Sequence, residues 1–187
     1  KLDNHLKKIH LLSISYKDAA VHIREKFSLS LEDAKLFYSL KDKYSIDECY
    51  ILSTCNRTEF YAVINDIESF KNFIIGGYKN LSKQIEIENL RHLSSINTVK
   101  HLMKVSAGMD SMILGETQIT SQIKSSFKNS REHSATGPIL NKLLQFCLEG
   151  GKRVRRNTKI SNGAISVSFA AVEKIQTIYK DFTDINI

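Results

Sequence analysis

Residues 48–64 read ECYILSTCNRTEFYAVI, and this segment decides the fold of the chain. Residues 48–53 and 58–64 are rich in the β-branched and aromatic side chains that strands favour, and a short polar turn separates them. The segment therefore predicts a β-hairpin whose turn carries Cys55. A turn at a sheet edge is accessible to substrates, so Cys55 is a candidate for chemistry.

The elements on either side of the hairpin give an α+β pattern. A strand over residues 9–15 and a short helix over 19–27 precede a helix that begins at Ser30, where the sequence Ser-Leu-Glu-Asp has a capping-box pattern. After the hairpin, Asp66 is placed to cap another helix, and residues 90–93 read as a fourth strand. This order predicts a ferredoxin-like βαββαβ antiparallel sheet with helices on one face, followed by a helical segment.

Glycine pairs are expected to interrupt the helices. Gly76-Gly77 should weaken or end the helix that Asp66 caps, and Gly150-Gly151 should end a helix opened by Pro138. A last helix is expected over residues 164–179. The final residues, Asp184-Ile185-Asn186-Ile187, look like the entry to another strand, and no Gly-x-Gly-x-x-Gly nucleotide motif is present.

The composition of the chain limits its class. It has 187 residues, 42% of them apolar, which suits a globular protein with one sizeable core. No apolar run approaches the ~20 residues that cross a bilayer, and three cysteines without a Cys-x-x-Cys pair indicate neither a disulfide framework nor a zinc site. We expect a reducing, cytoplasmic setting, no membrane contact and no metal.

The net charge of +7 favours a polyanionic partner. The densest basic cluster, residues 152–159, has no aromatic side chain among its cations, so contact with phosphates is a more suitable role for it than base stacking.

Cys55 lies two residues before Arg57 in the hairpin turn. A free thiol has a pKa of roughly 8.5, and a nearby cation favours the nucleophilic thiolate. Arg57 is a candidate for that cation, or for a group that binds a carboxylate of the substrate. The structural alternative is that Cys55 is a half-buried small apolar residue at the end of a strand.

Three blocks in one order resemble the signatures of glutamyl-tRNA reductases: residues 53–61, 101–119 and 163–172. The resemblance implies that residues 1–150 form the catalytic, substrate-binding domain, and that 151–187 form a helical linker to an NADPH-binding domain absent from this chain. It also implies glutamyl-tRNA as substrate, NADPH as cofactor, a homodimer through carboxy-terminal helices that are likewise absent, and glutamate-1-semialdehyde aminomutase as a partner.

The same resemblance assigns roles to individual residues. Cys55 would attack the glutamyl ester and hold glutamate as a thioester, which NADPH then reduces to glutamate 1-semialdehyde. His101 matches the activity-linked histidine and would move a proton to the leaving ribose oxygen, although a histidine on an amphipathic helix is also a common boundary residue. The predicted substrate-binding residues are Thr54, Asn56, Arg57, Ser111, Glu116, Thr117, Gln118 and Gln122.

The chain departs from the family pattern at two places. Thr117 stands where the family has proline between glutamate and glutamine, which leaves both polar side chains in place. Residues 15–19 read SYKDA where the family has Asn-His-Lys-Thr-Ala. Tyr16 therefore replaces the family's histidine, and no role of that histidine is carried over to this chain. Lys17 remains a candidate contact for a phosphate or carboxylate.

Two alternatives to the reductase function stay open at this point. One is a tRNA-binding module in which Cys55 is structural. The other is a thiol esterase that hydrolyses its acyl-enzyme with water.

Overall fold

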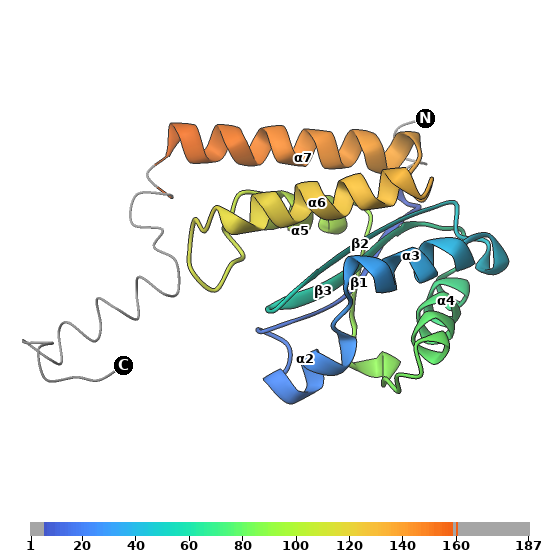
Figure 1. Ribbon diagram of the computed structural model, residues 1–187. Helices are drawn as coiled ribbons and strands as arrows, with labels where there is room; N and C mark the ends of the chain where they lie inside the picture. The colour runs from blue at the N-terminus through green and yellow to red at the C-terminus, as the bar shows by residue number, and fades with distance from the viewer. Residues whose placement is uncertain (1–5, 159, 161–187) are drawn as a thin grey trace, which may run out of the picture.

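The computed structural model describes residues 6–158 and residue 160, and contains one antiparallel sheet in the order β2-β3-β1-β4 (Figure 1). Its strands are β1 (Ile9–Ser15), β2 (Glu48–Thr54), β3 (Arg57–Val63) and β4 (Arg91–Ser94). In the central pair, Ser15 lies opposite Arg57 and Ile9 opposite Val63. This is the strand order of a ferredoxin-like sheet, so the predicted α+β class and the antiparallel sheet are confirmed.

Helices cover both faces of the sheet (Figure 1): the helices that alternate with the strands lie on one face, as predicted, and the later helices lie on the other. The first layer has α2 (Val21–Phe27), α3 (Leu31–Leu40) and α4 (Ile67–Asn80), with short 3-10 turns at Asp42–Tyr44 and Ile87–Asn89. The second layer has α5 (Ile96–Ser106), α6 (Gln118–Glu132) and α7 (Pro138–Asn157). The helical segment expected to follow the sheet is thus its second covering layer.

Strand β3 explains why both faces need covering. All seven of its residues are buried, and their side chains alternate between the two sides. Phe60 and Ala62 belong to the core beneath α3 and α4, whereas Tyr61 and Val63 belong to the core beneath α5, α6 and α7. A strand that is apolar on both faces requires a helical layer on each of them.

The predicted helix starts are confirmed. The Ser30 hydroxyl accepts from the backbone N–H of Asp33 at 3.0 Å, and the Asp33 carboxylate accepts from the backbone N–H of Ser30 at 2.9 Å. Asp66 accepts from the backbone N–H groups of Glu68 and Ser69. These side chains satisfy donors that the first turn of each helix leaves free.

The glycine pairs do not end helices, which corrects that prediction. α4 continues through Gly76-Gly77 to Asn80, and α7 continues through Gly150-Gly151 to Asn157. A Cβ at Gly77 would lie 2.1 Å from the Phe37 ring. Here glycine permits close approach of neighbouring elements.

The last helix predicted over 164–179 and the strand entry at 184–187 lie outside the described residues. Among the residues described, no helix has the length and apolar character needed to cross a bilayer.

Candidate active site around Cys55

The turn between β2 and β3 presents Cys55. Thr54 pairs with Arg57, so Cys55 and Asn56 form a two-residue connection between the strands. The Cys55 side chain is exposed, whereas the other two cysteines of the chain are buried. The structural alternative of a half-buried strand residue therefore does not hold.

Neighbouring elements fix the backbone of this turn. Arg24 of α2 donates from Nη1 to the carbonyl oxygen of Cys55 at 2.8 Å, and the N–H of Tyr16 donates to the carbonyl of Asn56 at 2.9 Å. The Asn56 N–H donates to Thr54 Oγ1 at 3.2 Å. The guanidinium that contacts Cys55 through its backbone thus belongs to Arg24, which sequence reasoning missed because α2 is far from the turn in the chain.

A pocket of about 460 Å³ opens at the turn. One wall comes from α2 and Ser28, a second from residues 54–58, and Met112 of the segment between α5 and α6 adds a third. Cys55 therefore lies in a concave site large enough for an aminoacyl group, with polar and apolar side chains around it.

Arg57 is buried, and its guanidinium is paired with carboxylates of the protein. Nη1 donates to Glu59 Oε1 at 2.8 Å and to Asp110 Oδ2 at 3.1 Å, and Nη2 donates to the Asp110 carbonyl. Lys17 donates to the other oxygen of Asp110. Burial works against the charged form of Arg57, but Glu59 and Asp110 more than offset this and raise the pKa of Arg57.

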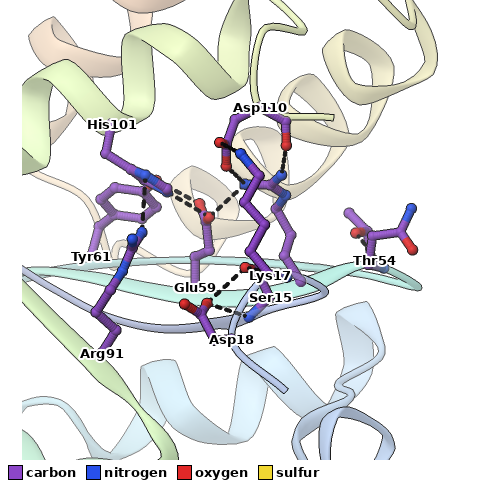
Figure 2. Close-up of polar contacts among 11 residues, drawn as sticks. Ser15, Lys17, Asp18, Thr54, Glu59, Tyr61, Arg91, His101 and Asp110 are labelled. Atoms are coloured by element: carbon purple, nitrogen blue, oxygen red, sulfur yellow. Dashed lines mark hydrogen bonds and ion pairs between the residues drawn. The ribbon is translucent and has the colours of Figure 1, made fainter. Parts of the chain in front are cut away.

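His101 joins this network on the side of Glu59. Its Nε2 lies 2.7 Å from Glu59 Oε1, its Nδ1 lies 3.4 Å from Arg91 Nη2, and Tyr61 donates its hydroxyl to Glu59 Oε2 at 2.6 Å (Figure 2). When His101 is neutral, Nδ1 must accept, because arginine can only donate, and Nε2 carries the hydrogen that Glu59 receives. The network thus selects one tautomer of His101.

Glu59 is fully buried and ionised. Burial alone would raise its pKa, but the hydrogen bond and charge of His101, the charge of Arg57 and the Tyr61 hydroxyl lower that pKa to about 2. Glu59 and Arg57 share one face of β3 because they are two residues apart. The two-residue spacing could have indicated Glu59 as a partner of Arg57 from the sequence. No sequence feature near Arg57 indicates Asp110 as its other partner.

The predicted site residues fall into three groups. Thr54, Cys55, Asn56 and Arg57 line one pocket, and His101 lies behind it through Glu59. Ser111 and Glu116 are half-buried in the segment before α6. Thr117 and Gln118 are exposed at the start of α6. Gln122 lies on α6 with Gln118 and borders a different pocket, which also includes Ser53.

We compared the chain with a family model, with individual relatives and with solved structures. Residues 12–158 match the family model described as the N-terminal domain of glutamyl-tRNAGlu reductase. The chain belongs to this family. Among the described residues, no group of three or more His, Cys, Asp or Glu side chains is arranged to hold a metal ion.

Relatives extend the match along the chain. A glutamyl-tRNA reductase of Oceanobacillus iheyensis is 39% identical over 184 residues, covering 94% of this chain and 40% of the relative. The glutamyl-tRNA reductase of Bacillus subtilis is 38% identical, and the match covers 91% of this chain and 38% of that relative. The solved structure of the glutamyl-tRNA reductase from Methanopyrus kandleri superposes with a TM-score of 0.74 at 25% sequence identity. The match covers 91% of this chain and 40% of that one. The chain thus spans about 40% of the length of these reductases.

Proposed function

We propose that this chain forms the glutamyl thioester in a glutamyl-tRNA reductase. The observation that carries the proposal is the exposed Cys55 thiol at the tip of a rigid hairpin, inside a pocket, in a chain of this family. The thiolate attacks the ester carbonyl of glutamyl-tRNA, and the bond to the terminal ribose oxygen breaks. The released RNA takes a proton, and glutamate remains on Cys55 as a thioester.

NADPH, when bound to the full-length enzyme, would supply the hydride that reduces the thioester to glutamate 1-semialdehyde and frees the Cys55 thiolate. The described residues of this chain provide the acyl-transfer half: they present the thiol, hold the turn and surround the acyl group. The predicted homodimer, the aminomutase partner and a cytoplasmic setting stay predictions.

For Arg57 and His101 the contacts support defined roles. Arg57 borders the Cys55 pocket and keeps donors that Glu59 and Asp110 do not use, so it is placed to receive the γ-carboxylate of glutamate. His101 acts on Arg57 through Glu59. Direct proton transfer from His101 to the leaving oxygen requires its Nε2–H to leave Glu59.

The other predicted substrate contacts divide by position. Thr54 and Asn56 border the pocket and are placed to bind polar groups of glutamate. The remaining five belong to the segment from residue 111 to the first turns of α6, whose Met112 reaches the pocket. Ser111, Glu116, Thr117 and Gln118 are proposed to bind the glutamyl group from that side, and Gln122 from the pocket that it borders with Ser53.

The test is the mass of the protein after exposure to glutamyl-tRNA without NADPH. The expected result is one added glutamyl group on the peptide that contains Cys55, or slow release of glutamate by hydrolysis. Cys147→Ser is the matched control, because that thiol is buried, and it should behave like the parent. If Cys55→Ser also behaves like the parent, Cys55 is not the nucleophile.

The same experiment separates the alternatives. A tRNA-binding module with a structural cysteine would bind uncharged tRNA and form no adduct. A thiol esterase would release glutamate from small esters as readily as from glutamyl-tRNA. Family membership favours the reductase over both.

A further inference from the structure

A second hollow, of about 620 Å³, borders the C-terminal end of α2, the helix that also lines the Cys55 pocket. Its walls come from the end of α2, the end of α4 and residues 82–89. Three lysines line it, Lys26, Lys79 and Lys83, together with a single carboxylate, that of Glu86. The hollow is therefore positively charged.

In the described part of the chain these three lysines form no ion pair, although the charge of Lys83 adds to the Ser30 hydrogen bonds in lowering the pKa of Asp33. Within residues 6–158 and 160, none of their ammonium groups lies within ion-pair distance of a carboxylate, and Lys83 instead donates to the carbonyl of Ser28 at 2.8 Å. Like charges around one hollow repel each other, and a bound anion would relieve that repulsion. Lysine is a point-charge donor well suited to phosphate.

The hollow neighbours the proposed active site at the end of α2. Ser28 borders the Cys55 pocket, and its carbonyl accepts from Lys83, which borders the hollow. Arg24 of the same helix holds the Cys55 carbonyl, while Lys26 faces the hollow. The two sites are therefore neighbours, so a ligand with its reacting end at Cys55 and a negatively charged body would have the hollow beside it.

We propose that Lys26, Lys79 and Lys83 bind backbone phosphates of the RNA whose 3′ end delivers the acyl group to Cys55. The proposal rests on the proposed function for the identity of this RNA. An RNA backbone fits better than a single small anion because three separate lysines line an open hollow next to the acyl site, and the chain carries a net charge of +7.

The experiment measures binding of uncharged tRNA to the 187-residue chain at several salt concentrations. In the variant Lys26→Gln, Lys79→Gln, Lys83→Gln, the slope of log affinity against log salt should become shallower by about 2 to 3, with a loss of affinity of about tenfold or more at low salt. The same three positions changed to Arg should keep the parental slope, and circular dichroism should show parental folding for both.

A matched control removes three charges from another basic hollow. Lys124, Lys128 and Arg131 of α6 border a pocket in the other helical layer, away from α2. Their replacement by Gln should change the slope by clearly less than the first triple variant. Equal losses in both variants would show unspecific electrostatics and overturn the proposal.

The adduct measurement is independent of this one. If the parent forms the Cys55 adduct and the Lys26, Lys79, Lys83 variant binds tRNA as the parent does, the phosphate site is wrong and the proposed function stands. If the parent forms no adduct but this variant alone loses tRNA binding, the phosphate site stands and the proposed function fails.

Discussion

At the scale of single residues, Glu59 is the centre of the buried network. It accepts from Arg57, His101 and Tyr61, so both of its carboxylate oxygens are occupied. A buried carboxylate is stable only when such partners compensate for the loss of water. Glu59 thereby links the strand that carries Arg57 to the helix that carries His101.

The low pKa of Glu59 predicts a loss of stability in acid. Its pKa is lowered from 4.5 to about 2 in the folded protein, so its contribution is present above pH 4.5 and is lost as the pH falls toward 2. At about 1.4 kcal/mol per pKa unit, the contribution to the free energy of unfolding is about 3 kcal/mol. Urea denaturation from about pH 7 to about pH 3 should show about 2 kcal/mol of this loss, the rest falling between about pH 3 and about pH 2.

Glu59→Gln provides the comparison. It should cost about 3–5 kcal/mol near neutral pH, because Arg57 and His101 lose a buried charged partner. The difference between parent and variant should shrink as the pH falls. A difference that stays constant with pH would mean that Glu59 is not ionised in the folded protein.

Some residues of the site could be predicted from the sequence, and others could not. The hairpin turn, the accessible Cys55 and a nearby Arg57 were predicted from the local pattern, whereas the roles of Thr54 and Asn56 came from the resemblance to the family. The partner that occupies Arg57, Asp110, is 53 residues away in the chain. No local pattern indicates such a contact, because it depends on how α5 and the following segment pack on the sheet.

At the scale of elements, the close approach of α5 and α7 depends on Gly151. A Cβ at this position would lie 2.5 Å from the backbone oxygen of Ser106, and backbone cannot move aside as a flexible side chain can. Arg155, one turn later, donates to the same oxygen at 2.6 Å. The two helices are therefore fixed at this crossing.

Gly151→Ala should therefore lower the free energy of unfolding by about 1–3 kcal/mol. The matched variant is Gly150→Ala, whose Cβ would meet only the flexible end of Met103, at 2.8 Å. Because alanine favours helix over glycine by about 1 kcal/mol, Gly150→Ala should be neutral or stabilising. Thermal denaturation of both variants checks this, and equal destabilisation would contradict the proposed helix crossing.

A histidine pair joins β1 to the edge strand β4. His10 Nδ1 lies 3.0 Å from His92 Nε2, and the two rings are stacked with centroids 5.2 Å apart. Burial lowers the pKa of both, followed by the charge of His92 for His10 and that of Lys71 for His92. The pair is therefore stable only while at least one ring is neutral.

This pair predicts a second, milder pH dependence. Since both folded pKa values are below the ordinary 6.5, the contribution is present above pH 6.5 and is lost as the pH falls below it. His92→Gln should reduce the fall in unfolding free energy between about pH 8 and about pH 5.5. His22→Gln, on the exposed side of α2, is the control and should leave that fall unchanged.

At the scale of the whole molecule, the sheet couples two hydrophobic cores. Cys49 of β2 lies in the core beneath α3 and α4, and Cys147 of α7 lies in the core on the opposite face. Burial raises the pKa of both thiols, that of Cys147 to about 12. The reactivity of each thiol therefore measures whether the core on its own face of the sheet is still folded.

Alkylation in urea should show that the two layers open together. In a Cys55→Ser background, Cys49 and Cys147 should become reactive with the same denaturant midpoint, because β2 and β3 contribute side chains to both cores. Reaction of the two thiols is measured by mass spectrometry of their peptides. Separate midpoints would mean that one helical layer unfolds without the other.

The sequence by itself determined the strands, the helix starts, the hairpin turn with Cys55 and the family, because alternation, capping and motif spacing are local properties of the chain. The tertiary structure alone decided that helices cover both faces, that Arg24 holds the Cys55 turn, that Asp110 pairs with Arg57, and that glycine pairs continue their helices. These features depend on contacts between distant residues, which packing in three dimensions selects.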